Sequence, residues 1–342
     1  MKKLSFFKRI MLFLNVIVVF CLFLACIVPY TSIASLAFIS LTVPALVCIN
    51  MLFVLFWSLG KKIYLTLSLT VLVYGYFTLG SFISFKSFSS SANQEDTFSI
   101  MSFNSLGFRG KNDEWERTAG DTIVKFILEQ KPDIVCFQEF DYKKIRSDYF
   151  QEYPYKYVDF EFGPDNGRVI QAIYSKYKIL DNAFLDFKES SNSAIYADII
   201  VKSDTLRVYN LHLESLKIRP SYIKKERSDR LFVRLRRTFE VQQEQAKIVR
   251  KHMNDSPYRN IVCGDFNNTQ FSKVYFNIKG NLKDTFLEAG RGYGETIKFW
   301  KFPFRIDMIL TDPSIEVLSH KNYKINISDH EPIMATFKIP HQ

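Results

Sequence analysis

Hydrophobic residues follow two different patterns along this chain. Up to Phe85 they form long stretches without a charged side chain, whereas from Phe98 onward they occur in short runs separated by polar turns and amphipathic segments. Long apolar stretches are typical of helices that cross a membrane, and short ones of buried strands. The sequence therefore predicts an N-terminal membrane segment followed by a folded domain rich in strands.

Three charge-free stretches are long enough to cross a bilayer. They contain 19, 27 and 23 residues and cover residues 10–28, 33–59 and 63–85. At ~1.5 Å per residue they reach ~28–40 Å as helices, against a hydrocarbon core of ~30 Å. The second is over-long, so we expect it to tilt, or to bend near Pro44. A cleaved signal peptide is the alternative for the first, but its apolar run is too long and no small-residue cleavage site follows.

Basic residues flank these stretches asymmetrically. The first 85 residues contain six Lys or Arg and no Asp or Glu; four precede the first stretch, and Lys61 and Lys62 separate the second from the third. Positive charge marks the cytoplasmic side, so three spans predict that everything after Lys86 lies on the extracytoplasmic side of the cytoplasmic (inner) membrane. Residues 86–97 are expected to form a flexible linker to a folded domain over residues 98–342.

The folded domain reads as a succession of strands with few helices. Residues 112–130 and 238–253 are predicted as amphipathic helices. So many strands with so few helices predict an α/β protein of two packed mixed β-sheets flanked by helices, a four-layer α/β sandwich, behind three transmembrane helices. The candidate strands are Phe98–Phe103, Asp133–Gln138, Val169–Ser175, Ala194–Val201, Leu206–His212, Asn260–Gly264, Phe304–Thr311 and Pro332–Ile339.

Charge and cysteine content narrow the function little. The net charge of +10 falls to +4 for residues 86–342, so most of the excess comes from the basic residues that flank the apolar stretches. The charge is therefore no evidence of nucleic-acid binding. Cys136 and Cys263 lie inside strand-like runs and form no disulfide framework, which leaves the compartment open. One segment, residues 217–251, carries twelve basic and four acidic residues. It is either a solvated face or a contact surface for polyanions or anionic lipid headgroups.

Polar residues recur at the ends of the predicted strands. Because strand ends of a sheet protein meet along one rim, we expect these side chains to converge. Any one of them alone could be a turn former or a structural strand-end residue, but the repetition argues for a site. Hard oxygen ligands beside two imidazoles suit metal-assisted hydrolysis of phosphate esters. The motifs are FNSLG with Asn104, PDIVCFQE with Glu139, YNLHLE with His212, GDFNNT with Asp265 and Asn267, FRIDMIL with Asp307, and SDHEPI with Asp329 and His330.

In their order and local pattern these motifs resemble the endonuclease/exonuclease/phosphatase superfamily, in a deoxyribonuclease I-like, membrane-anchored form. The resemblance covers Phe98 to Ile339 and includes AIYSKYKI at residues 172–179. It implies a divalent cation, Mg²⁺ or Mn²⁺, with Glu139 as main ligand, Asn104 close to the same ion and Asp329 as a further ligand.

The same resemblance implies catalytic roles. Asp265 is similar to the carboxylate that orients or deprotonates the attacking water, and Asn267 to the amide that holds the scissile phosphate. His330 resembles the histidine that contacts the phosphate, with Asp307 fixing its tautomer and charge. His212 resembles a second histidine found in the deoxyribonuclease I and sphingomyelinase branches.

The expected function is a membrane-anchored phosphodiesterase of nuclease type. A phospholipase C-like, sphingomyelinase-like or phosphatase activity on lipid headgroups is the alternative, so the expected partners are nucleic acid or phospholipid besides the bilayer. Leu106 stands where repair-type nucleases carry an acidic residue, which weakens an abasic-site repair function. A non-catalytic binding module is a third hypothesis, disfavoured because every expected polar position is retained.

Overall fold

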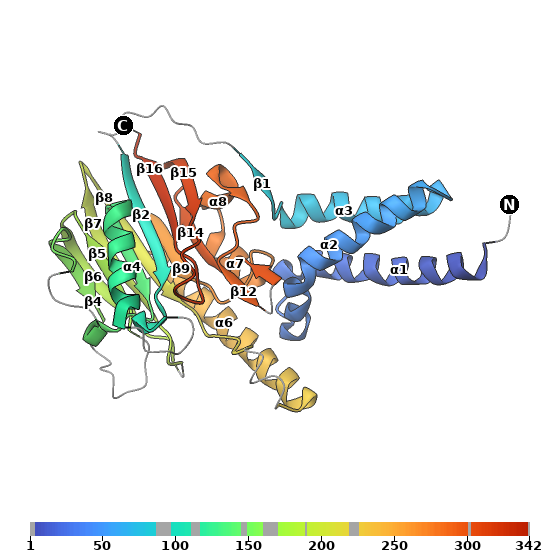
Figure 1. Cartoon of the computed structure of the whole chain (residues 1–342), viewed down its shortest axis with the longest axis horizontal. Coiled ribbons are helices and arrows are strands. Elements are labelled where there is room, and N and C mark those ends of the chain that lie inside the picture. Colours follow the sequence, from blue (N-terminus) through green and yellow to red (C-terminus); the bar gives the residue numbers. More distant parts are fainter. Residues whose placement is uncertain are drawn as a thin grey trace.

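Two bodies make up the molecule: a bundle of three N-terminal helices and a folded domain from which they project (Figure 1). The computed structural model describes residues 4–86, 97–110, 117–144, 149–159, 170–188, 190–218, 226–299 and 302–340. Most of the expected linker, residues 87–96, lies outside the described residues.

Three N-terminal helices are long and apolar enough to cross a membrane. They pack against one another, and the buried Asn15 donates a hydrogen bond to Ser68 and accepts one from Trp57, so one polar cluster joins all three. Short 3₁₀ turns flank the second and third helices. The elements are α1 (Phe6–Ile27), η1 (Val28–Tyr30), η2 (Ala34–Leu36), α2 (Ala37–Ser58), η3 (Lys62–Tyr64) and α3 (Leu65–Leu79).

The third helix ends earlier than its apolar stretch. A span to Phe85 is expected from composition, but α3 ends at Leu79, where Gly80 takes a left-handed backbone (φ 76°). The chain then forms β1 (Ser84–Phe85), which pairs with β11 (Arg291–Gly292) of the folded domain. The chain after Gly80 therefore docks on the domain, where the Phe82 ring contacts Phe271 and Tyr293.

Two six-stranded mixed sheets form the centre of the domain. The first has the order β15-β16-β2-β3-β5-β4 and the second β10-β14-β9-β8-β7-β6, with β2–β3 and β8–β9 parallel and all other pairs antiparallel. The first sheet consists of β15 (Glu316–Asn322), β16 (Ile333–Lys338), β2 (Thr97–Asn104), β3 (Ile134–Gln138), β5 (Ala172–Ser175) and β4 (Tyr155–Val158). The second consists of β10 (Lys283–Asp284), β14 (Asp307–Thr311), β9 (Arg259–Asp265), β8 (Asp204–His212), β7 (Ala194–Val201) and β6 (Ile179–Leu185).

Side chains alternate between the faces of each strand, and this alternation builds the layers. In β2, Ile100 points into the core between the sheets, while Met101 points outward and packs under α4 (Arg117–Gln130). In β9, Cys263 faces the inner core and Val262 packs under α6 (Ser228–Asn254) and α7 (Lys273–Lys279). The predicted fold of two packed mixed sheets flanked by helices is thus confirmed.

One helix, α6, differs from expectation. α4 is described from Arg117, because residues 112–116 of the expected helix lie outside the described part of the chain. α6 begins ten residues before Thr238, in a segment whose many arginines hide the apolar pattern. The other elements are η5 (Leu106–Phe108), η6 (Tyr142–Lys144), α8 (Thr285–Ala289), β12 (Ile297–Phe299) and β13 (Phe302–Phe304).

The loop after β9 rests on the helix bundle. Phe271 is buried in one cluster with residues of α1, α2 and α3. Thr269 Oγ1 lies 3.4 Å from the Ser40 carbonyl oxygen, and Gln270 Nε2 donates to the Ser81 carbonyl at 2.9 Å. Lys273 Nζ lies 2.9 Å from Ser32 Oγ in the turn between α1 and α2. The bundle and the domain therefore share a packed interface.

Candidate active site

The predicted site residues lie at strand ends on one rim of the two sheets. Asn104 ends β2, His212 ends β8 and Asp265 ends β9, while Asp307 begins the antiparallel β14. His212 and Asp307 are both register partners of Asp265. Glu139 directly follows β3, the parallel neighbour of β2. Strand register therefore places His212, Asp265 and Asp307 side by side in one sheet and Asn104 next to the Glu139 strand in the other.

Three motif residues at the rim have a positive φ. Gly264 has a φ of 135°, and a Cβ there would lie 2.1 Å from the Leu211 carbonyl oxygen, so only glycine fits before Asp265. Glu139 and Asn267 have φ values of 49° and 48°, a left-handed conformation that is uncommon outside glycine and is often found at functional sites.

His330 and Asp307 form a buried pair. His330 Nδ1 lies 2.8 Å from Asp307 Oδ2. Burial disfavours the charged imidazole, but the carboxylates of Asp307 and Asp265 outweigh it and hold the pKa of His330 well above its ordinary value. The protonated ring can then donate from Nε2 toward the rim. Ser328 fixes the turn, since its hydroxyl accepts from His330 N and donates to the Asn104 carbonyl.

Asp265 lies at the centre of the site and is buried. Its Oδ2 lies 3.6 Å from His330 Nε2, 3.7 Å from His212 Nε2 and 3.2 Å from Asn104 Nδ2. Burial raises the pKa of the Asp265 carboxyl to about 6, opposed by the two histidines and assisted by Asp307. A carboxylate with a pKa close to neutrality is suited to accept a proton from water.

Glu139 supplies the most exposed carboxylate of the group. Its Oε1 lies 3.2 Å from Asn104 Nδ2, the same amide that contacts Asp265, and 3.9 Å from His212 Nε2. Two carboxylates that converge on one amide form an arrangement that a divalent cation would stabilise, so the donors fit the expected metal. Asn104 Oδ1 accepts instead from Leu106 N. Its amide therefore orients the carboxylates, and a direct ligand role stays a prediction.

A second grouping of potential ligand atoms lies next to it. Atoms of Asp265, Asp307 and His330 lie within 4.8 Å of one another, the only such cluster that the described residues form. Because His330 Nδ1 is already bound to Asp307, this cluster suits proton transfer better than metal binding.

Asn267 and Asp329 lie at the edges of the site. Asn267 N donates to Asp265 Oδ1 at 2.7 Å, and its side-chain Nδ2 donates to the Leu213 carbonyl. Asp329 is half-buried beside His330, whose pKa it helps to raise, and accepts from Ser328 at 3.4 Å. Their expected contacts with phosphate and metal stay predictions.

Sequence reasoning missed the polar residues beneath the rim. Gln138 Nε2 donates to Asn210 Oδ1 at 2.5 Å, which joins β3 of one sheet to β8 of the other. Asn210 Nδ2 donates in turn to the Phe137 and Ala172 carbonyls. Both side chains are fully buried, so they fix how the two rims face each other. The available signal was an amide within each apolar run, directly before Glu139 and two residues before His212.

Comparison with protein families agrees with this geometry. The model of the Endonuclease/Exonuclease/phosphatase family matches residues 101–330, which contain every predicted site residue. The chain belongs to this family. Its members are generally phosphoester hydrolases that depend on divalent metals. Residues 8–82 match a separate domain of unknown function (DUF8431). A search of the curated proteins gave no match.

Solved structures share the fold of the family domain. An endonuclease/exonuclease/phosphatase from Bacteroides vulgatus is 19% identical, with a TM-score of 0.54, over 71% of this chain and 99% of that one. Truncated Caenorhabditis elegans TDP2 is 19% identical, with a TM-score of 0.52, over 71% and 97%. The human Nocturnin catalytic domain with bound sulfate is 19% identical, with a TM-score of 0.51, over 72% and 95%. At these identities the likeness establishes the fold alone.

Proposed function

We propose that this family member is a membrane-anchored, divalent-metal-dependent phosphodiesterase whose site is formed by Asp265, His330, Asp307, His212 and Glu139. The observation that carries the proposal is the buried Asp265, placed within 4 Å of both histidine Nε2 atoms. The three apolar helices are proposed to span the cytoplasmic membrane and to hold residues 98–342 on its extracytoplasmic side.

The side chains divide the chemistry among them. Asp265 Oδ2 takes the proton of the attacking water, consistent with its raised pKa. His330, kept protonated by Asp307, donates from Nε2 to a phosphate oxygen as negative charge develops there. His212 Nε2 reaches the same space from β8 and holds a second oxygen. Asn267 follows Asp265 by two residues and is proposed to contact the scissile phosphate.

Glu139 and Asn104 would hold the divalent cation, with Asp329 as a candidate further ligand. When bound, such a cation supplies Lewis-acid stabilisation of the phosphate charge. Glu139 is positioned for this by its left-handed backbone and by the Asn104 amide.

Two substrate classes remain candidates. A nuclease-type activity is the one expected from the resemblance. A lipid headgroup is favoured by one observation: Thr269, four residues after Asp265, contacts Ser40 in the first turn of α2. Four residues span at most ~14 Å, so the site would open close to the membrane surface.

Hydrolysis assays on the purified full-length protein test the proposal. With Mg²⁺ or Mn²⁺ we expect cleavage of bis-p-nitrophenyl phosphate in preference to the monoester. The Asp265→Asn variant should lose on the order of a hundredfold or more in turnover. Asp181→Asn, an exposed carboxylate on β6, is the matched control. No metal-dependent hydrolysis, or an active Asp265→Asn protein, would contradict the proposal. DNA and RNA in solution, compared with phospholipid in nanodiscs, then separate the two substrate classes.

A further inference from the structure

The N-terminal part of α6 differs from the rest of this helix. Residues 227–237 contain five arginines and one aspartate, a net charge of +4, whereas residues 238–254 carry three Lys or Arg and two Glu. The C-terminal part packs on the second sheet through Ala246, Val249 and Met253. The N-terminal part extends beyond the sheets and passes the beginning of α2 (Figure 1).

Residues 227–237, called here the arginine segment, contact the beginning of α2. The Phe232 ring stacks on Phe38 with centroids 5.0 Å apart and planes 7° from parallel. Leu235 and Phe239 are buried in one cluster with Ala34 and Ala37. Because Phe38 lies in the first turn of α2, the arginine segment lies at the depth where the proposed span enters the bilayer.

Apolar side chains of the arginine segment remain uncovered at this depth. Phe232 is 47% exposed and Val233 59% exposed. Tyr30 and Ile33, in the turn between α1 and α2, are 67% and 56% exposed. Large exposed apolar residues on a basic helix are typical of helices that lie in the membrane interface.

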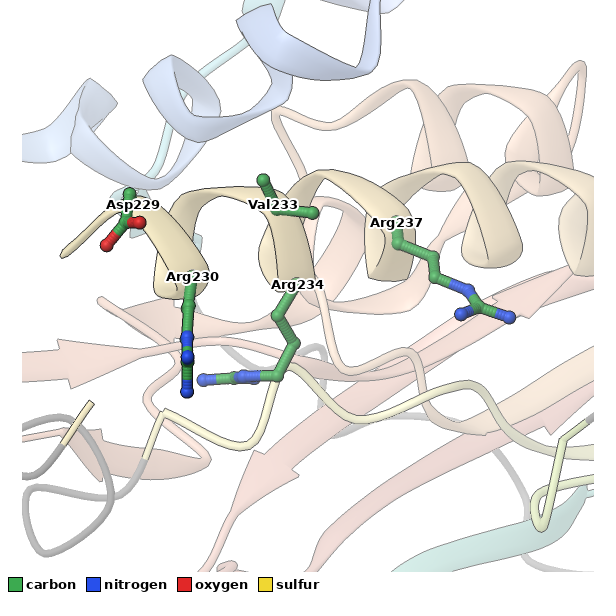
Figure 2. A pocket seen from close by; sticks show the side chains of 5 residues that line it. All are labelled: Asp229, Arg230, Val233, Arg234 and Arg237. Atoms are coloured by element: carbon green, nitrogen blue, oxygen red, sulfur yellow. The ribbon is translucent and has the colours of Figure 1, made fainter. Parts of the chain in front are cut away.

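Cationic side chains form a stripe beside these apolar residues. Arg230, Arg234 and Arg237 follow one another at helical spacing and, with Asp229 and Val233, line an open hollow of about 390 Å³ (Figure 2). Arg234 is engaged with Glu226 and the Leu216 carbonyl. Arg237 makes no ion pair within the part of the chain that the structure describes. Its charge is thus available to an external anion.

We propose that the arginine segment is an interfacial helix that binds anionic phospholipid headgroups of the leaflet on the domain side. The inference rests on the spanning of a bilayer by α1–α3, a part of the proposed function, and is independent of the catalytic chemistry. Phe232 and Val233 insert among the headgroups, while Arg230 and Arg237 pair with lipid phosphates. The arginine segment would thus attach the domain to the membrane at a second point besides α1–α3. This contact would fix the orientation of the domain, and of the active-site rim, relative to the membrane surface.

Fluorescence quenching on the full-length protein in nanodiscs tests this proposal. A bimane label is placed at Val233→Cys after Cys21→Ala and Cys48→Ala, and its quenching by headgroup-labelled lipid is compared with quenching by aqueous acrylamide. Phosphatidylcholine discs with and without phosphatidylglycerol are compared. A label at Phe77→Cys, a lipid-facing position of α3 that is 81% exposed, reports bilayer insertion. A label at Glu129→Cys on α4 reports exposure to water.

We expect phosphatidylglycerol to raise lipid quenching and lower acrylamide quenching at position 233 severalfold. A basic side chain near an anionic leaflet strengthens binding roughly fivefold, so Arg230→Gln/Arg237→Gln should abolish most of this gain. The charge-matched control Lys125→Gln/Lys156→Gln should retain it, because these lysines belong to α4 and β4, which lie on the far side of the domain from the arginine segment (Figure 1). Unchanged hydrolysis of bis-p-nitrophenyl phosphate would show that both variants are folded.

Three results would overturn the proposal. In the first, acrylamide quenches the label at position 233 equally in both kinds of disc, while lipid quenches the label at Phe77→Cys. This result would exclude membrane binding by the arginine segment and leave the bilayer anchoring intact. In the second, phosphatidylglycerol still raises lipid quenching at position 233 in the Arg230→Gln/Arg237→Gln variant, which would exclude the role of these two charges. If Phe77→Cys is not quenched by lipid, the bilayer anchoring fails and this inference fails with it.

Discussion

His330 Nδ1 lies 2.8 Å from Asp307 Oδ2, and both side chains are buried at the rim of the two sheets. Asp307 is the first residue of β14 in the second sheet, and His330 lies in the connection between β15 and β16 of the first sheet. The bond orients the imidazole so that Nε2 faces Asp265. The two residues lie 23 positions apart in the sequence, and the packing of the sheets joins them into one unit.

This pairing predicts non-additive effects of mutation. Asp307→Asn and His330→Gln should each lower turnover by on the order of a hundredfold, and the double variant should lose little more than either, because residues that act as a unit are not additive. Combining Asp307→Asn with His212→Ala, from a different strand, should deepen the loss. A double-mutant cycle with one diester substrate measures this. Full additivity of Asp307 and His330 would show that they act separately.

Glu139→Gln should weaken Mg²⁺ or Mn²⁺ binding and lower turnover by roughly a hundredfold or more, because the proposed main ligand of the cation loses its charge. The fold should be unaffected, since the side chain lies at the rim outside the core clusters. Calorimetric metal titration and thermal unfolding measure the two effects. The exposed Glu152→Gln serves as control. Full activity of Glu139→Gln in the presence of EDTA would exclude the metal role.

The buried side chain of His320 should make the folded protein less stable at acidic pH. The side chain is buried on β15 with Nδ1 2.8 Å from Thr285 Oγ1, and burial lowers its pKa to about 4. The neutral ring is therefore favoured in the folded state. The contribution of neutral His320 to the free energy of unfolding is fully present above the ordinary histidine pKa of ~6.5. It falls as the pH drops from there toward 4, by up to about 3 kcal/mol.

Thermal unfolding of the full-length protein in detergent across this pH range measures the effect. His320→Gln should flatten the dependence, because glutamine does not titrate. An equal slope in both proteins would assign the acid sensitivity to other groups.

Membrane topology gives a further prediction. If the basic residues at the N-terminus and at Lys61–Lys62 face the cytoplasm, protease added to spheroplasts should digest the domain after Lys86. A cytoplasmic marker protein should stay intact in the same sample. Digestion only in inverted vesicles would place the domain in the cytoplasm and reverse the proposed orientation.

The same chain shows what can be predicted without a structure and what cannot. All eight expected strands correspond to the eight inner strands of the two sheets, whereas the four edge strands, β4, β6, β10 and β15, were not expected. Inner strands are buried on both faces and give continuous apolar runs. An edge strand such as β6, with Asp181 and Asn182 exposed at its centre, gives no such pattern.

The sequence by itself determined the apolar N-terminal helices, the fold class and the identity of the polar residues at the strand ends, because these follow from local periodicity and short motifs. Only the tertiary structure decided which atoms meet: Asn104 turns its amide nitrogen toward Glu139 and Asp265, Gln138 reaches Asn210 across the sheets, and the loop after Asp265 rests on the helix bundle. These contacts join residues from distant parts of the chain. Their geometry is set by how two sheets and three helices pack, and no local pattern in the sequence encodes it.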